Sequence, residues 1–95
     1  MLKLTANIES FDNHYVAYIE NTKNIKGMVV EGSSIEEVVK ELLISFKVKI
    51  AFDYGIDVDS IETKEFKSKK ELAEFKKLLQ NGNRQAKKEF NLSIC

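Results

Sequence analysis

The fold is decided by residues 31–39, Glu31-Gly32-Ser33-Ser34-Ile35-Glu36-Glu37-Val38-Val39, in which a strand ends and a long helix begins. Ser34 stands where its side chain can cap the first helical turn, and Glu37 follows at the spacing of a capping box. The Ser-Glu pair one residue earlier has the same spacing and is an alternative cap. Gly32 gives the backbone freedom to turn. The junction therefore predicts strands before it and a helix after it.

Three short strands are predicted before this junction. Residues 2–9 alternate between apolar and polar side chains, which is typical of a strand with one buried and one wet face. Residues 15–20 are rich in β-forming types, and an Asp-Asn turn before them predicts an antiparallel hairpin. Residues 28–31 predict the third strand. The wet face of this sheet is expected to carry Lys3, Thr5, Asn7, Glu9, Val16 and Tyr18.

The helix after the junction is expected to run from about Ile35 to Tyr54 and to end near Gly55. One apolar stripe should pack on the sheet, and it consists of Ile35, Val38, Val39, Leu42, Leu43, Phe46 and Ile50. A second apolar stripe, on another side of the helix, consists of Ile44, Val48, Ala51 and Phe52. A helix that is apolar on two sides is usually buried on two sides. Either the C-terminal segment or another subunit should cover the second stripe, which makes it a candidate oligomer interface.

The remaining residues predict a fourth strand near 61–66 and a second helix from 69 to about 80, capped by Ser68. Residues 84–90 are expected to form one more short helical piece or a frayed tail. The predicted class is α+β, with a small antiparallel sheet of three to four strands, a long helix on one face and the order β-β-β-α-β-α. We expect an α+β domain over residues 1–66. Residues 67–95 would form a basic helical extension, packed on that domain or swapped from it.

Charge is unevenly distributed although fifteen basic and fifteen acidic side chains balance overall. Residues 1–60 carry six basic and ten acidic side chains, whereas residues 61–95 carry nine basic and five acidic ones. An acidic front half suits a basic partner. Because Arg84 is the only arginine, we do not expect this chain alone to read DNA sequence.

Several classes of site lack the residues that they require. Cys95 is the only cysteine and His14 the only histidine, so neither an intrachain disulfide nor a Cys/His metal site is expected. Asp12, Asp53 and the pair Asp57 and Asp59 fall in a turn, at a helix end and in a loop, so we interpret them as surface carboxylates. No run approaches the roughly 20 apolar residues of a membrane helix. We expect a cytoplasmic protein without a leader peptide, membrane contact or cofactor.

The order of these elements resembles the HicB-like antitoxin family over about residues 2–66. The residues that carry the resemblance are Tyr15 and Ala17 in a Tyr-x-Ala strand, Gly27 at a loop end, Gly32 and Ser34 in a turn, and 36–38 (Glu-Glu-Val) at the helix start. The chain departs from the family in two places. It has no proline before Gly27, and Ser33 stands where an acidic residue is usual.

The resemblance implies a partial ribonuclease-H-like fold that has lost catalysis. It also implies a role in binding and silencing a small mRNA-cleaving toxin of a type II toxin–antitoxin system, with a small basic toxin as the partner. Val16, Tyr18 and Glu20 are the candidate partner-binding residues, unless another strand or helix covers them. The alternatives are a metal-dependent ribonuclease-H-like nuclease and a stand-alone structural or adaptor domain.

Family members often carry a separate segment that binds operator DNA. A ribbon-helix-helix arrangement here would use residues 61–66 as the ribbon and residues 69–80 and 84–90 as its helices. The second of those helices is too short, so DNA binding by this chain alone is not expected. A homo-oligomer, a dimer or larger, is expected from the second apolar stripe of the long helix.

Overall fold

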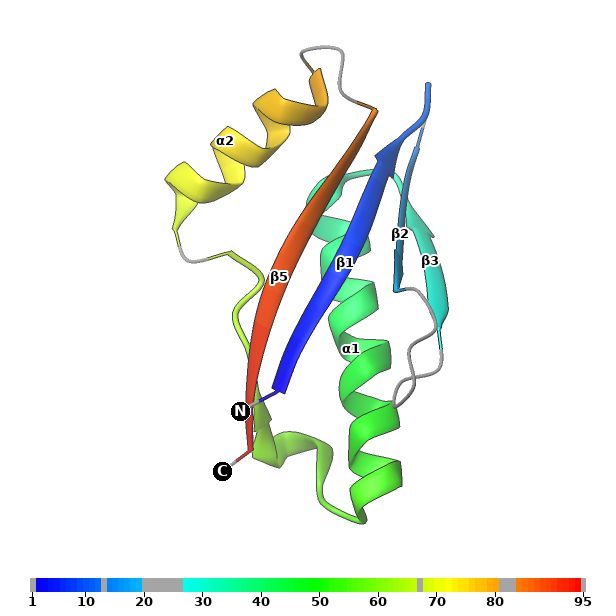
Figure 1. The fold of residues 1–95 in the computed structure, drawn as a ribbon, viewed down its shortest axis with the longest axis vertical. Coiled ribbons are helices and arrows are strands. Elements are labelled where there is room, and N and C mark those ends of the chain that lie inside the picture. The colour runs from blue at the N-terminus through cyan, green and yellow to red at the C-terminus, as the bar shows by residue number, and fades with distance from the viewer. Residues whose placement is uncertain (1, 13, 20–26, 67, 81–83, 95) are drawn as a thin grey trace.

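The computed structural model describes residues 2–12, 14–19, 27–66, 68–80 and 84–94. Its elements in chain order are β1 (Leu2–Ser10), β2 (Tyr15–Ile19), β3 (Met28–Gly32), α1 (Ile35–Tyr54), a single 3-10 turn (Val58–Ser60), β4 (Ile61–Glu62), α2 (Lys69–Gln80) and β5 (Gln85–Ile94). The strands form one antiparallel sheet in the order β3-β2-β1-β5-β4 (Figure 1). The α+β class predicted from the sequence is confirmed.

The first three strands and the long helix lie where the sequence predicts them. Strands β1 and β2 form the expected hairpin, with Asn7 opposite Tyr18, and β3 pairs with the other side of β2. All seven residues of the predicted inner stripe of α1 are buried. They pack against Leu4, Ala6 and Ile8 of β1 and Ala17 of β2 in one core.

The prediction of a helical piece or frayed tail at residues 84–90 is wrong, because residues 85–94 form β5. This strand pairs with β1 over eight positions, from Leu2 opposite Leu92 to Glu9 opposite Gln85. Ala86, Phe90 and Leu92 alternate with polar residues at a period of two, with Lys88 as the one charged residue in their row, and this pattern fits the long free edge of β1. The sheet therefore has five strands instead of three to four. Residues 67–95 contribute a ten-residue strand beside the central β1 as well as a helix.

The expected fourth strand at residues 61–66 is shorter than predicted, since β4 covers only Ile61–Glu62. The chain leaves the sheet after Glu62 and continues to α2. Ser68 caps this helix as predicted, because its hydroxyl accepts a hydrogen bond from Glu71 N–H. Phe66 packs beside Phe75 of α2, with 6.0 Å between ring centroids. Phe66 therefore packs on α2, and the segment that carries it follows the early end of β4.

Both helices meet the same face of the sheet. Lys88 of β5 lies opposite Ala6 of the core and forms an ion pair with Glu71 of α2. Phe75 and Leu79 of α2 are buried in the same core as α1. Figure 1 shows α1 running behind β1 and β2, whereas α2 lies beyond β5. The opposite sheet face has no helix over it in the described part of the chain.

The junction that opens α1 combines a cap with a close backbone approach. Ser34 is the N-cap, and its hydroxyl accepts a hydrogen bond from Glu37 N–H at 3.1 Å. The Glu37 carboxylate in turn accepts hydrogen bonds from the N–H and the hydroxyl of Ser33, at 3.0 and 2.7 Å. The capping box therefore closes on the residue before the N-cap. A Cβ placed on Gly32 would lie 2.9 Å from Cγ1 of buried Val38.

Helix α1 ends as the sequence predicts, at a glycine in the left-handed region. Gly55 has a φ of 65°, where a side chain would be strained. The next N–H, that of Ile56, donates to the carbonyl of Ala51 at 3.0 Å. This pattern is a Schellman motif, and it satisfies carbonyl groups that the last helical turn leaves open.

We predict that Gly32→Ala lowers the free energy of unfolding by about 1–3 kcal/mol, because the added methyl overpacks the strand against α1. Urea denaturation would measure the loss. The control is the same change in a Val38→Ala background, where the contact is relieved and the extra loss should shrink. An equal loss in both backgrounds would show that this contact is not the cause.

A second prediction concerns acid stability. The hydrogen bonds from the Ser33 hydroxyl and N–H lower the pKa of Glu37 below its ordinary value of 4.5. A carboxyl with a depressed folded-state pKa contributes stability above its unfolded pKa and loses it as the pH falls through the folded pKa. Glu37→Gln should therefore flatten the loss of stability below about pH 4.5, measured by denaturation at several pH values. Glu41→Gln, at an exposed position on the same helix, is the matched control. Equal slopes for Glu37→Gln and wild type would contradict the prediction.

Candidate partner-binding surfaces

The open face of the sheet carries the side chains that point away from both helices. Alternation along each strand and the pairing register place these residues on one face. They are Lys3, Thr5, Asn7 and Glu9 of β1, Val16 and Tyr18 of β2, Val29 and Glu31 of β3, and Gln85, Lys87, Glu89 and Asn91 of β5. All six residues expected on the wet face from the sequence lie here.

Tyr18 is at the centre of a hydrogen-bonded cluster on this face. Its hydroxyl donates to Oε1 of Glu9 at 3.2 Å and accepts from Nε2 of Gln85 at 2.8 Å. These bonds join β2, β1 and β5, so the half-buried ring is held in place. Val29 lies directly opposite Tyr18 on β3 and is 67% exposed. Tyr18, half-buried Val16 and Val29 form an apolar area that we call the sheet patch.

The predicted partner-binding residues are only partly placed by the structure. Val16 and Tyr18 lie side by side on the open face, two residues apart on β2. Glu20, the third, lies outside the described residues. The structure adds Val29, whose place beside Tyr18 depends on the β2–β3 register. Val29 stands in a predicted strand, so the sequence could indicate that its side chain is exposed. Only the pairing register shows that it lies beside Tyr18.

Carboxylates border the sheet patch on both sides of β2. Glu9 of β1 and Glu31 of β3 each lie directly opposite Val16, one on each neighbouring strand. The basic side chain nearest in register is Lys87 of β5, which is opposite Asn7. The row through Val16 is therefore acidic at both ends. This local arrangement matches the acidic balance of residues 1–60.

Asn7 departs from the expectation of a wet side chain. It lies on the open face, yet it is only 4% exposed, between Tyr18 and Lys87 on the neighbouring strands. Its Oδ1 atom is buried and has no hydrogen-bond partner in the part of the chain that the structure describes. A buried polar atom without a partner costs stability, and such departures concentrate at functional sites. Sequence alternation alone could not show this burial, because it depends on the side chains of two other strands.

The second apolar stripe of α1 is largely exposed. The exposed fractions are 47% for Ile44, 55% for Val48 and 86% for Phe52, whereas Ala51 is buried. These three exposed residues are spaced by four, so they line one side of the helix, which we call the outer stripe. The C-terminal residues in the described part of the chain, α2 and β5, pack elsewhere. Covering of the stripe by the C-terminal segment is thus not observed, and Ala51 does not belong to the exposed stripe.

The aspartates that could suggest nuclease chemistry serve separate local roles. Asp53 forms an ion pair with Lys49 at 3.3 Å on α1. Asp57 caps the 3-10 turn, with its Oδ1 accepting from Asp59 N–H. Asp12 is exposed beside the first hairpin turn. Among the described residues no three His, Cys, Asp or Glu side chains are close enough to hold a metal ion together.

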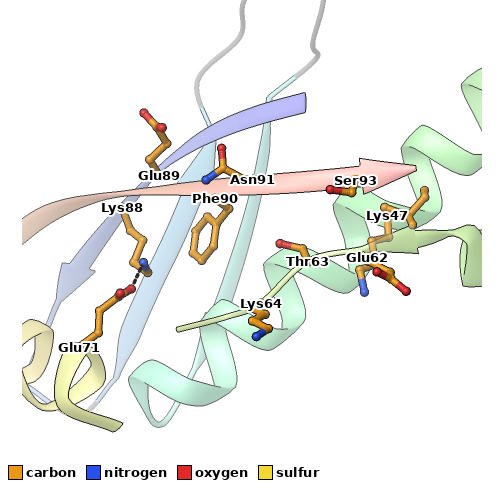
Figure 2. A pocket seen from close by; sticks show the side chains of 11 residues that line it. Lys47, Glu62, Thr63, Lys64, Glu71, Lys88, Glu89, Phe90, Asn91 and Ser93 are labelled. Atoms are coloured by element: carbon orange, nitrogen blue, oxygen red, sulfur yellow. Dashed lines mark hydrogen bonds and ion pairs between the residues drawn. The ribbon is translucent and has the colours of Figure 1, made fainter. Parts of the chain in front are cut away.

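A cavity of about 540 Å³ lies beside β5 (Figure 2). Its lining residues come from α1, β4 and the segment after it, α2 and β5. Lys88 lies at one end, where it pairs with Glu71 and sits over the rings of Phe66 and Phe90, 5.1 and 5.2 Å from their centroids. The sequence could not reveal this cavity while residues 84–90 were expected to be helical.

Comparison with known proteins adds no relative to this description. No protein-family model, no curated protein and no solved structure matches the chain. Within the described residues, neither helix is both long and apolar enough to cross a membrane. The fold and the surfaces therefore define an α+β protein with an open sheet face, an exposed apolar helix stripe and a cavity beside β5.

We predict that Asn7→Val raises the free energy of unfolding by about 1 kcal/mol, because it removes a buried polar atom that has no partner. Thermal or urea denaturation would measure the gain. Thr5→Val, at an exposed position on the same face of β1, is the control and should change stability by less than about 0.5 kcal/mol. A clear loss of stability in Asn7→Val would mean that the Asn7 amide has a hydrogen-bond partner in solution.

Proposed function

We propose that this chain is a non-enzymatic, HicB-like antitoxin that binds and neutralises a small, basic, mRNA-cleaving toxin. The proposal starts from the order of motifs along residues 2–66. The residues that carry the resemblance belong to one structural unit, β1-β2-β3-α1. Ala17 is buried in it, Gly32 permits the close approach to α1, and Ser34 caps the helix. These residues have structural roles, which is what a shared fold would require.

The observation that carries the proposal is the open sheet face with its patch. Val16, Tyr18 and Val29 offer apolar and aromatic surface, and polar side chains surround them. Protein interfaces have this composition, and tyrosine is enriched among the residues that contribute most to binding. Because Tyr18 is already held by Glu9 and Gln85, little side-chain freedom remains to be lost on binding.

The charges around the patch favour a basic partner. Glu9 and Glu31 border Val16 on both sides, so a positively charged surface would meet carboxylates there. Complementary charge speeds association and fixes orientation more than it raises affinity. A toxin that binds RNA must carry a basic surface, and an acidic cover over that surface would compete with RNA. This mode of neutralisation needs no catalytic residue.

Self-association is a second part of the proposal. The outer stripe of Ile44, Val48 and Phe52 lies on α1, whereas the sheet patch lies on the face of the sheet that points away from α1. Exposed apolar stripes of this kind commonly mark protein contacts. We assign the outer stripe to a second copy of the chain and the sheet patch to the toxin, so one chain can engage both. Operator binding is not included, since residues 85–94 form a strand instead of the last helix of a ribbon-helix-helix.

The proposal predicts that a neighbouring reading frame encodes a short basic protein and that co-expression gives a complex without RNA cleavage. Val16→Asp should weaken the complex at least tenfold, because it puts a buried charge into the apolar contact. Calorimetry or surface plasmon resonance would measure the affinity, with circular dichroism as the check on folding.

The matched control is Val48→Asp on the outer stripe, the same substitution at an exposed valine on the other candidate surface. It should leave toxin binding unchanged and reduce self-association in analytical ultracentrifugation. If a folded Val16→Asp variant keeps full affinity, the sheet patch is not the toxin site. If no basic partner is encoded and none binds, a stand-alone structural or adaptor role replaces the antitoxin proposal.

A further inference from the structure

The cavity beside β5 lies along the edge of a strand and not over a sheet face. Four consecutive residues of β5, 88–91, line it. Consecutive side chains of a strand point to opposite faces, so a space over one face would meet only alternate residues. Lys88 and Phe90 belong to the helix-covered face and Glu89 and Asn91 to the open face. The cavity must therefore lie at the outer edge of β5.

Most of that edge has no strand beside it in the described part of the chain. On its inner side β5 pairs with β1 from Gln85 to Leu92. On its outer side it pairs only at two positions, Ile94 with Ile61 and Ser93 with Glu62. Residues 63–66 then run beside β5 without pairing, and no described backbone hydrogen bond of a turn or loop joins them to it. Figure 2 shows this segment separated from β5 at Thr63 and Lys64.

An unpaired strand edge presents backbone N–H donors and carbonyl acceptors in a regular row. Natural proteins usually block such an edge with charges, prolines or a covering element. Here the edge opens into a cavity that Ile61 and Phe90 line with apolar surface. The ligand whose own donors and acceptors match this row is another extended backbone, as in strand addition. We propose that the cavity binds an extended peptide segment, which joins the sheet as a new strand beside β5.

The charges of the lining favour an acidic peptide. Three of the lining charges have partners within the chain: Lys88 and Glu71 pair with each other, and Oε1 of Glu89 lies 3.9 Å from Nζ of Lys3. Lys47 and Lys64 have no ion-pair partner among the described residues, and the carboxylate of Glu62 is the only lining acid left to oppose them. Two cations against one anion select a peptide with an acidic side chain near Lys47 and Lys64.

Thr63 adds a polar requirement to the same site. Its Oγ1 atom is buried and has no hydrogen-bond partner among the described residues, although Thr63 lines the cavity. A ligand group that forms a hydrogen bond with a buried hydroxyl of this kind stabilises the complex. The free edge from Ala86 to Leu92 spans about 20 Å at roughly 3.3 Å per residue, so a peptide of about six or seven residues matches its length.

This site goes beyond the proposed toxin contact and does not depend on it. The sheet order is β3-β2-β1-β5-β4, so the sheet patch on β2 and β3 lies toward one edge and the cavity lies toward the other. The two surfaces also have opposite charge preferences. The patch has acidic neighbours and suits a basic partner, whereas the cavity has two lysines without an ion pair to any described residue and suits an acidic one.

Two other occupants are possible in principle, and the experiment separates them from a peptide ligand. The chain's own residues 63–66 would have to pair with β5, but Phe66 is packed against Phe75 and lies under Lys88. A second copy would have to pair edge to edge with β5, past the segment that forms the outer wall of the cavity. Hydrogen exchange measured without peptide tests the first case. Analytical ultracentrifugation without peptide tests the second.

The test uses the full chain and a capped heptapeptide of alternating Thr and Val with a central Glu. Nuclear magnetic resonance titration should shift the amide signals of residues 86–92. It should protect from hydrogen exchange those amides among them that point to the outer edge and not to β1. The counterpart with a central Lys should bind at least fivefold more weakly. Methylating alternate peptide nitrogens should abolish binding when they face β5 and leave it intact when they face away, which is the signature of backbone pairing.

Charge-reversal variants give the matched control. Lys47→Glu and Lys64→Glu should each weaken the Glu peptide at least fivefold, whereas Lys40→Glu, exposed on α1 outside the cavity, should not. The proposal is overturned if neither peptide binds at millimolar concentration, or if methylation on either side has the same effect. It is also overturned if the amides at the β5 edge are already protected without peptide, either in the monomer or in a concentration-dependent dimer. Loss of toxin binding in Val16→Asp leaves this result unchanged, so the two proposals fail separately.

Discussion

The pairing of β1 with β5 is the constraint on which the rest of the structure depends. It joins residues 2–9 to residues 85–92, the two ends of the described chain, over eight positions. Without β5 the strand β1 would be an edge, and the core residues Leu4 and Ile8 would lose Phe90 and Ala86, which lie opposite them on β5. The same pairing brings Lys88 to Glu71 and so links α2 to the sheet. The sheet patch lies on the β2 side of this pair of strands, and the cavity lies on the outer side of β5.

The two faces of the sheet have different tasks because both helices lie on one of them. The covered face supplies the core, and Leu4, Ala6 and Ile8 at its centre are almost fully buried. The open face keeps charged and polar side chains, as antiparallel sheets commonly do. Tyr18 and Asn7 are exceptions on that face, one held by two hydrogen bonds and the other buried with an unpartnered oxygen. These exceptions adjoin each other on paired positions of β1 and β2, and this is why we place a partner there.

The three surfaces differ in chemistry, so they suit different partners. The sheet patch is apolar with carboxylates on both sides, and the outer stripe of α1 is apolar. The cavity beside β5 combines a backbone edge with Lys47 and Lys64. We propose that these separate surfaces bind a partner, a second copy and a peptide. Such a role fits a binding protein, in which the fold positions contacts instead of reacting groups.

Local patterns in the sequence determined the strands before the junction, the cap at Ser34, the inner stripe of α1, the end at Gly55 and the span of α2. These features depend on neighbours within a few residues, so capping spacing and hydrophobic period are enough to predict them. Only the tertiary structure decided that residues 85–94 are a strand, that β4 ends at Glu62, that Asn7 is buried and that a cavity follows β5. The alternation in residues 85–94 was present in the sequence, but a strand forms only where a partner edge is available. The free edge of β1, more than seventy residues away along the chain, provides it.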